Sequence, residues 1–253
     1  MTETLSLRAK IEQSPMGAYQ WMIVVMAAIM NLLDGFDVLA LAFTATAIRS
    51  EFGLTGIELG YLLSAGLFGM TAGSLFLAPL ADKIGRRPLL LMAVSLSAIG
   101  MLGSAFISQY QWLGFWRVIT GLGVGGILVG TNVITSEYSS RKWRSFAISV
   151  YAAGFGIGAV LGGMFAVMLQ GEYGWRSVFL AGAILTGLLL VVLFIWLPES
   201  IDFLTSKQPK NAEVRLNLIA KKIGLSGNWK LPAKTEKVKT KLPITQLFSE
   251  KYS

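Results

Sequence analysis

The sequence contains no cysteine and no histidine. The first absence excludes disulfides and thiolate metal sites, and the second excludes histidine catalysis and His-ligated zinc. The phosphate-binding pattern G-x4-G-K-[ST] is also missing, and no nucleophile and base stand at a recognisable enzymatic spacing. We therefore expect no enzyme activity, no metal and no cofactor, and any proton chemistry must use Asp, Glu, Tyr or Lys.

Charge is scarce and apolar residues are abundant. Only 14% of the 253 residues are charged, against about 25% in an average soluble domain. Six continuous apolar runs each approach the ~20 residues that span a bilayer. They lie at about 19–43, 58–80, 88–108, 112–137, 145–169 and 175–197. Since the runs do not alternate, they predict an all-α integral membrane fold with six transmembrane helices between a polar lead (1–18) and a lysine-rich tail (198–253).

The positive charges follow the topology of these spans. All but Arg49, Arg117 and Arg176 of the 22 Lys and Arg residues fall on one side of the predicted membrane. The positive-inside rule places that side, and with it both termini, in the cytoplasm of a multi-pass plasma (bacterial inner) membrane protein. The net charge of +8 therefore reflects topology rather than a nucleic-acid partner. A second interpretation assigns part of the tail's charge to binding of anionic lipid.

The first span carries two acids, Asp34 and Asp37, one turn apart. An ionised Asp at the centre of a membrane helix costs about 2.5 to 3.5 kcal/mol and usually has a basic partner. Arg117, inside the fourth span, lies at a depth similar to that of Asp37. Asn31 lies one turn inward of Asp34 and extends the polar stripe. We predict a proton- and substrate-binding site formed by Asp34, Asp37, Arg117 and Asn31.

The alternative is a buried ion pair that only holds helices together. Two acids facing one base leave one carboxyl group without compensation, and burial disfavours its charged form. Such an acid can take up and release a proton near neutral pH. The fork of Arg117 fits a carboxylate, so it can hold an acid and an anionic substrate in turn.

A second charged cluster occupies the turn between the second and third spans. Gly85 supplies the turn, and the two arginines after it oppose the dipole of the helix that they begin, so they require acids. The candidates are the adjacent Asp82 and Glu137, which has Arg141 four residues further on. A cluster of this type can latch one conformation, and the alternative is a plain positive anchor. The predicted latch comprises Asp82, Gly85, Arg86, Arg87, Glu137 and Arg141.

Five short motifs together resemble a known family. The turn Leu80-Ala81-Asp82-Lys83-Ile84-Gly85-Arg86-Arg87 resembles the major facilitator superfamily signature between helices 2 and 3, with Ala78 where that family usually has Gly. The run Arg117-x3-Gly121-x-Gly123-x-Gly125-Gly126 is similar to its helix 4 signature. Asp34-Gly35-Phe36-Asp37, Thr135-Ser136-Glu137-Tyr138 and Leu197-Pro198-Glu199-Ser200 resemble the aromatic acid:proton symporter family within it.

The resemblance implies a twelve-helix carrier of two six-helix halves, each built from two inverted three-helix repeats. The chain then corresponds to the N-terminal half, and residues 198–253 form a cytoplasmic linker to an absent C-terminal half. The glycines at four-residue spacing in the fifth span, Gly154, Gly158 and Gly162, would face that half. A complete six-helix protein that dimerises is the alternative.

The function that follows is import of a small aromatic carboxylate together with protons. The expected partners are an anionic small molecule, protons, the lipid bilayer and the second half. Two alternatives stay open. The first is a carrier of another organic anion, such as a short organic acid or sialic acid. The second is a membrane sensor or scaffold that transports nothing.

Overall fold

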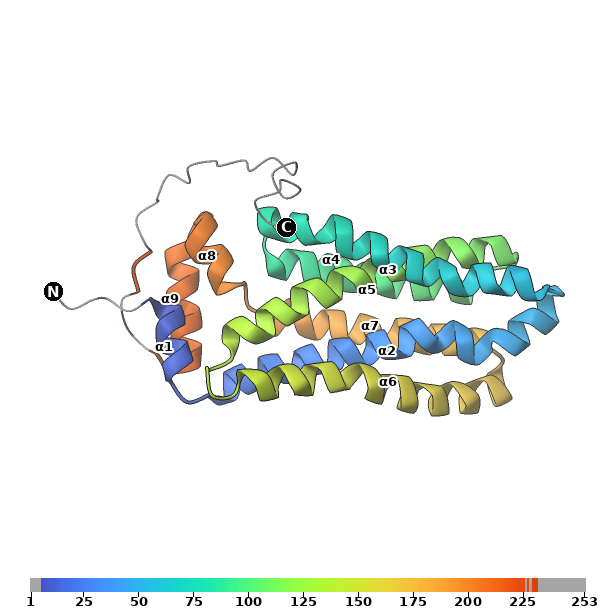
Figure 1. Ribbon diagram of the computed structural model, residues 1–253, viewed down its shortest axis with the longest axis horizontal. Helices are drawn as coiled ribbons and strands as arrows, with labels where there is room; N and C mark the ends of the chain where they lie inside the picture. The colour runs from blue at the N-terminus through green and yellow to red at the C-terminus, as the bar shows by residue number, and fades with distance from the viewer. Residues whose placement is uncertain (1–5, 226, 228, 232–253) are drawn as a thin grey trace, which may run out of the picture.

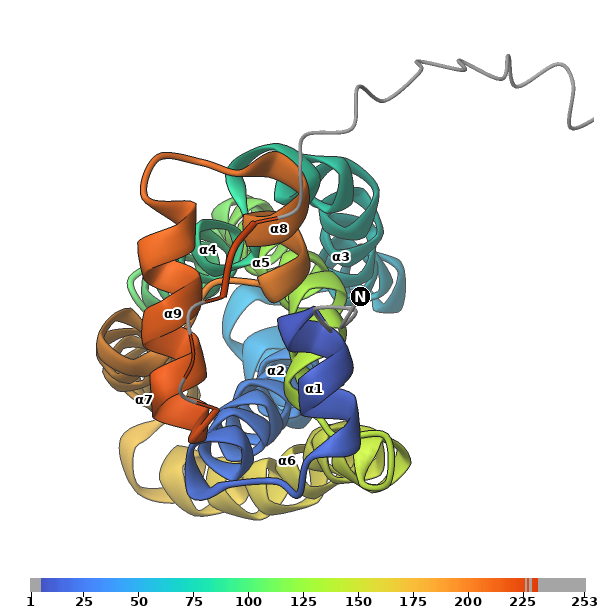
Figure 2. The same ribbon diagram turned by 90° about the vertical axis from the view of Figure 1, so that its left-hand side faces the viewer.

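The computed structural model describes residues 6–225, 227 and 229–231, and it contains helices and no strand within them. Three short helices, α1 (Leu7–Gln13), α8 (Ile201–Lys207) and α9 (Ala212–Ile223), gather at one end of a long bundle (Figures 1 and 2). The bundle itself consists of α2 (Ala18–Phe52), α3 (Gly56–Ile84), α4 (Arg86–Ala105), α5 (Tyr110–Tyr138), α6 (Arg144–Tyr173) and α7 (Arg176–Trp196).

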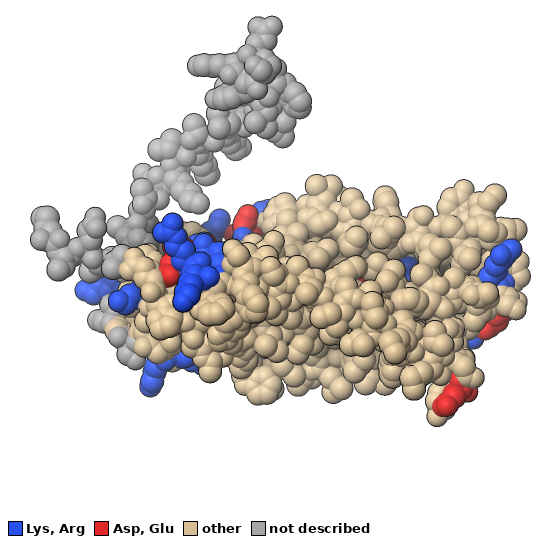
Figure 3. Space-filling view, turned by 60° about the horizontal axis from the view of Figure 1, so that its bottom comes forward, with Lys and Arg blue, Asp and Glu red and all other residues tan. Residues whose placement is uncertain are grey.

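Helices α2 to α7 are each long and apolar enough to cross a membrane. Charged side chains lie towards the two ends of the molecule, and the flank between them is almost free of charge (Figure 3). This arrangement confirms the predicted all-α fold with six transmembrane helices. The short helices were not predicted, because a search for apolar runs of bilayer length passes over a seven-residue helix such as α1.

The largest difference from the predicted boundaries is in the first span. We predicted an end near residue 43, but α2 continues to Phe52 and stops at Gly53, whose φ of 63° is left-handed. Thr55 and Glu58 then form a capping box that begins α3. Hydropathy reports where the apolar stretch ends, whereas the helix ends where glycine and a capping residue interrupt it.

The six helices show the internal symmetry of two three-helix units, α2–α4 and α5–α7. In the most apolar 18-residue stretch of α2 and of α5, 61% of residues are buried, against 17% in α3 and in α6. Helix α3 packs mainly on α5, and α2 packs mainly on α6. These two contacts exchange when α2 is matched with α5 and α3 with α6, as inverted repeats require. The first helix of each unit is therefore central and the second is peripheral.

Close helix contacts depend on glycine. A Cβ on Gly158 of α6 would overlap the main-chain carbonyl of Leu32 on α2, and a Cβ on Gly35 would overlap that of Phe155 on α6. Small residues allow such backbone approach. The expectation that the glycines of this span face an absent half is thus wrong, because Gly154 and Gly162 also lie against α2, at Ala28 and Phe36.

Substitution at these glycines tests the packing. Gly158→Ala should destabilise the folded chain by about 1 to 3 kcal/mol, because the new methyl group meets backbone that cannot move aside. Gly156→Ala is the matched control, since a Cβ there has nothing within 4 Å. The measurement is thermal unfolding of both purified variants in detergent. Equal midpoints for the two variants would contradict the close approach of α2 and α6.

Candidate functional site

The polar residues predicted from the first and fourth spans lie inside the bundle. Helix α2 carries Asn31, Asp34 and Asp37 on successive turns, and α5 carries Arg117. The residues are 3%, 2%, 2% and 3% exposed, in that order. Burial of an ion costs several kcal/mol unless it is well paired, so the partners of these groups decide what the site can do.

Arg117 and Asp37 meet through the main chain. Arg117 Nη1 donates to the backbone oxygen of Asp37 over 3.3 Å, whereas the Asp37 carboxylate accepts a hydrogen bond from Ser97 Oγ on α4. No ion pair within the described part of the chain joins Arg117 to either acid. The two residues therefore lie at one level, but the predicted pairing of guanidinium and carboxylate is not formed, because the Asp37 side chain turns towards α4.

The remaining neighbours of the Arg117 guanidinium are uncharged side chains, an aromatic ring and a thioether. Its guanidinium lies over the Phe179 ring, 5.3 Å from the centroid, and Nη2 donates to the Met101 sulfur over 3.4 Å. A cation–π contact contributes about 2 kcal/mol or more when desolvated, less than a carboxylate partner would. Arg117 is thus held in place without being neutralised, which leaves its charge available to an anion.

Several buried polar atoms have no hydrogen-bond partner among the described residues. Four of the seven such atoms belong to this site: Asn31 Oδ1, Asp34 Oδ2, Asp37 Oδ1 and Arg117 Nε. The other three, Arg86 Nε, Ser140 Oγ and Arg144 Nε, lie elsewhere. Buried polar groups in native proteins are nearly always paired, so such a concentration requires an explanation. Water, protons or a bound substrate would satisfy these atoms, and that is the property expected of a functional site.

Asn31 is directed away from the other site residues. Its Nδ2 donates to the Tyr151 carbonyl over 2.8 Å and to the Ala152 carbonyl over 3.4 Å, both on α6. The predicted polar stripe is therefore divided. Asn31 ties α2 to α6, while Asp37 faces α4 and α5.

A narrow pocket, with about 30 Å³ of space for the centres of water-sized molecules, borders Asp37 and Arg117 between α2, α3 and α5. Thr120 on α5 adds a hydroxyl group, and the rest of the wall is apolar. The apolar lining includes Leu41, Leu62, Leu67, Met70 and Val124. One cation at the end of an apolar pocket suits a small organic anion with an apolar body.

Sequence reasoning missed four side chains around this site: Ser97, Met101, Thr120 and Phe179. Thr120 could have been found, because it follows Arg117 by three residues and shares its helix face. The other three come from α4 and α7 and look like ordinary filler of an apolar helix. Only the packing of α4 on α5, and of α7 on α4 and α2, brings them to Asp37 and Arg117.

The predicted latch contains one of its expected ion pairs. Asp82 and Arg86 are joined at 2.6 Å across one helical turn. Gly85 lies between α3 and α4 with φ of 105°, and a Cβ there would contact the Glu199 carboxylate. Glycine is therefore required at this turn for two reasons: it adopts the positive φ without strain, and it leaves room for the carboxylate.

Glu199 is the acid that caps α4, and it was not predicted as part of the latch. Its Oε1 accepts from the main-chain nitrogens of Arg86, at 2.8 Å, and Arg87, at 3.1 Å. In return, the Arg87 side chain donates to the carbonyls of Leu197, at 2.8 Å, and Phe194, at 2.6 Å. The Glu199 carboxylate thus caps the start of α4, and the Arg87 guanidinium caps the end of α7. Each charge has the sign that interacts favourably with the dipole of the helix end that it contacts.

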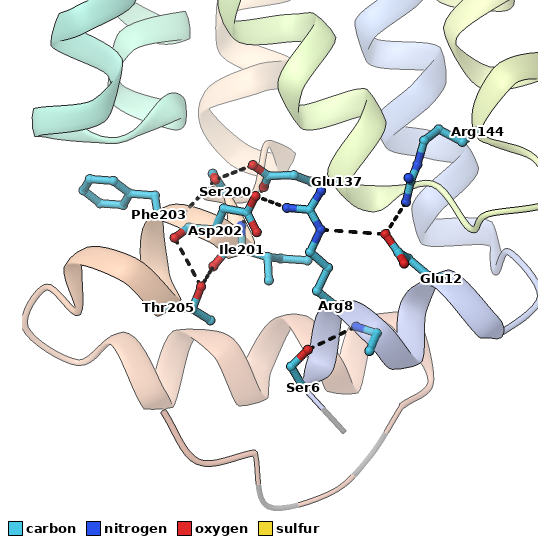
Figure 4. A network of polar contacts seen from close by, with 11 residues as sticks. Ser6, Arg8, Glu12, Glu137, Arg144, Ser200, Ile201, Asp202, Phe203 and Thr205 are labelled. Carbon is cyan, nitrogen blue, oxygen red and sulfur yellow. Dashed lines mark hydrogen bonds and ion pairs between the residues drawn. The ribbon is translucent and has the colours of Figure 1, made fainter. Parts of the chain in front are cut away.

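Glu137 does not form the expected ion pair with Arg86, Arg87 or Arg141 among the described residues. Glu137 accepts from Ser200 Oγ and from the Ile201 nitrogen, each at 2.9 Å, so it binds the start of α8 instead of an arginine (Figure 4). The Arg141 main-chain nitrogen donates to the Glu12 carbonyl over 2.9 Å. The sequence could not indicate these partners, because α1 and α8 were not predicted.

Two further ion pairs hold α1 against the bundle (Figure 4). Glu12 pairs with Arg144 at 2.6 Å, and Arg8 pairs with Asp202 of α8. The hydrogen bond from Arg144 holds the pKa of Glu12 below its ordinary value. Glu12 therefore stays charged at neutral pH, so α1, α8 and the connection between α5 and α6 form one charged assembly at this end.

Comparison with known proteins matches this architecture. The sequence model of the Major Facilitator Superfamily matches residues 27–251. The gallate transporter of Pseudomonas putida is 34% identical over 242 residues, which are 96% of this chain and 54% of that protein. The 4-hydroxybenzoate transporter PcaK of P. putida is 34% identical over 216 residues, 85% of this chain and 48% of that protein.

Solved structures agree on the fold. The proton:xylose symporter XylE bound to 6-bromo-6-deoxy-D-glucose superposes with a TM-score of 0.74 at 22% identity, over 83% of this chain and 50% of that one. The chain thus spans about half the length of the proteins that it matches. The six membrane helices form two related units, and an Asp-Arg pair lies at the turn between α3 and α4. With the family match, these features show that this chain belongs to the major facilitator superfamily.

Proposed function

We propose that this chain forms the N-terminal half of a carrier that imports a small aromatic carboxylate together with protons. The observation that carries the proposal is the cluster of buried, incompletely paired charges, Asp34, Asp37 and Arg117, beside an apolar pocket. Relatives named for transport of gallate and 4-hydroxybenzoate favour an aromatic acid. Since members of the superfamily are carriers, the prediction that the chain is not an enzyme is confirmed.

The pocket suits the two parts of such a substrate. The carboxylate can approach Arg117, whose Nε lacks a partner among the described residues. The aromatic ring would then lie against Leu62, Met70 and Val124, which line the same pocket. A methionine beside an aromatic ring adds a favourable sulfur contact. Arg117 therefore recognises the carboxylate of the substrate, and the apolar wall recognises its aromatic ring.

Charge balance gives a reason for proton coupling. Two ionised acids and one arginine leave the empty site with an excess negative charge, and a carboxylate substrate would add to it. Protonation of an acid removes this repulsion, which is strong in a buried site. Substrate binding and protonation therefore favour one another, as linkage requires of any coupled pair. Asp37, beside Arg117, is best placed to sense the substrate, and Asp34 has no cation to compensate it.

Topology and partners follow the charge distribution. The end that carries α1, α8 and α9 also carries most Lys and Arg residues (Figure 3), so we assign it, with both termini, to the cytoplasm of a bacterial inner membrane. Large apolar side chains such as Phe68, Phe76 and Met168 are 71%, 70% and 71% exposed on α3 and α6. These faces suit lipid and a second six-helix half.

The cytoplasmic end would act as a conformational latch. The Asp82–Arg86 pair and the mutual capping by Glu199 and Arg87 hold α3, α4 and α7 together. Opening this end requires these contacts to separate or to move as one body. We infer that they stabilise the state in which the cytoplasmic end is closed.

Removal of the site carboxyl groups tests the proton role. In the complete carrier, Asp34→Asn and Asp37→Asn should each reduce uptake driven by a pH gradient at least tenfold, because an amide cannot carry a proton. Glu213→Gln on α9, a surface acid, is the matched control and should retain uptake. Labelled 4-hydroxybenzoate uptake is the measurement, and wild-type rates in both site variants would refute the proton role.

Substitution of the arginine tests substrate recognition. Arg117→Ala should raise the KM for 4-hydroxybenzoate at least tenfold, because a buried charge-assisted contact is lost. Arg117→Lys keeps the charge without the fork and should retain part of the affinity. A panel of benzoate, short organic acids and sialic acid identifies the substrate class. Preference for a non-aromatic acid would favour the alternative carrier, and absence of all uptake would favour a sensor or scaffold.

Neutralisation of the latch tests its effect on conformation. Asp82→Asn removes an exposed ion pair of about 0.2 to 1 kcal/mol, so it should shift the ratio of inward to outward states up to about fivefold while substrate still binds. Since the sequence has no cysteine, Thr120→Cys supplies a single thiol in the pocket whose labelling reports access. Lost binding with an unchanged labelling ratio would contradict the latch.

A further inference from the structure

A second hollow lies at the end of the bundle, between the last turn of α7 and α9. This α7–α9 groove has a volume of about 680 Å³, counting its open mouth. It is separate from the transport pocket, with which it shares no lining residue. The residues used below to define it are Tyr19, Arg87, Trp196, Arg215, Leu218 and Lys222.

The groove carries an excess of positive charge. Arg87, Arg215 and Lys222 line it, and the one acid in its wall is Glu199. The Glu199 Oε1 is already occupied by main-chain N–H groups of Arg86, Arg87 and Ser200. No ion pair neutralises Arg215 or Lys222 in the described residues. The groove therefore attracts an anion.

The cations are arranged in a row. Arg215 and Lys222 are seven residues apart on α9, so they lie on one face about 10 Å from each other along the helix. Lys222 Nζ lies 5.3 Å from the centroid of the Tyr19 ring, which positions it. Arg87 Nε and Nη2 donate to carbonyls at the end of α7, and its guanidinium lies 5.7 Å from the centroid of the Phe194 ring. Its Nη1 has no hydrogen-bond partner among the described residues, so it can meet a ligand.

The groove also has an apolar border. Phe194, Ile195 and Trp196 on the last turn of α7 are 65%, 60% and 46% exposed. Leu218, between the two α9 cations, is 56% exposed. Leu216 and Ile219 of α9 are buried against the bundle, and Ile219 also lines the groove. Helix α9 lies at the end of the six-helix bundle (Figure 1), and we assign this level to the lipid headgroups.

We propose that the α7–α9 groove binds an anionic phospholipid. The phosphate lies among Arg87, Arg215 and Lys222, and an acyl chain follows the exposed apolar side chains of α7. Charge and apolar surface meet here in the order found in a phospholipid, and basic residues at the membrane surface favour anionic lipid. Such a lipid holds α9 against α7 and thereby stabilises the end of the bundle at which Glu199 caps α4.

The test uses the purified 253-residue chain in neutral detergent. Phosphatidylglycerol is titrated, and native mass spectrometry measures the fraction of chains that retain one lipid. The Arg215→Gln/Lys222→Gln variant should bind about tenfold more weakly than wild type, since two surface cations are lost. Lys207→Gln/Lys221→Gln is the matched control: it removes equal charge at exposed residues outside the groove and should bind like wild type.

Two competitors identify the source of the phosphate. Glycerol phosphate without acyl chains should not displace the lipid at equal concentration, and phosphatidylcholine should bind at least fivefold more weakly. Displacement by glycerol phosphate would reassign the groove to a soluble phosphate. Equal binding of phosphatidylcholine, equal loss in the control variant, or no retained phosphatidylglycerol would each overturn the proposal.

Discussion

The burial of charge between α2 and α5 is the constraint on which the rest of this structure depends. Asp34, Asp37 and Arg117 are at most 3% exposed, and no ion pair among the described residues joins them. Unpaired polar groups in an apolar interior are expensive, so surrounding contacts must hold these helices together. Gly35 and Gly158 bring α2 and α6 into backbone contact, and Asn31 adds a hydrogen bond to the same interface.

At the charged end of the bundle, by contrast, the buried or half-buried charges are paired with helix ends. There the acids and bases are matched to helix ends: Glu199 binds the start of α4, Arg87 the end of α7 and Glu137 the start of α8. Each contact satisfies main-chain groups that a helix leaves free at its ends. The same end therefore combines stable local caps with surface ion pairs, such as Glu12–Arg144, which contribute less. The surface ion pairs can therefore separate while the helix caps stay intact.

Internal symmetry explains why one span in each unit carries the site. In the two three-helix units, α2 and α5 occupy equivalent central positions. The acids lie on one and the arginine on the other, so Asp37 and Arg117 lie at one level where the units face each other, joined through the Asp37 main chain. The peripheral helices α3 and α6 expose apolar residues outward. Helix α3 supplies one wall of the pocket that borders Asp37 and Arg117.

Hydropathy, charge distribution and short motifs were enough to predict six membrane helices, the superfamily and the depth shared by Asp37 and Arg117, because each depends on residues near in sequence or on the bilayer. Partners could not be predicted in this way. The Asp37 carboxylate turns to Ser97, Glu137 binds α8 and Glu199 caps α4, over separations of 60 or more residues. Such contacts depend on how helices rotate and pack, since a turn of one helix by a single residue changes which side chains meet.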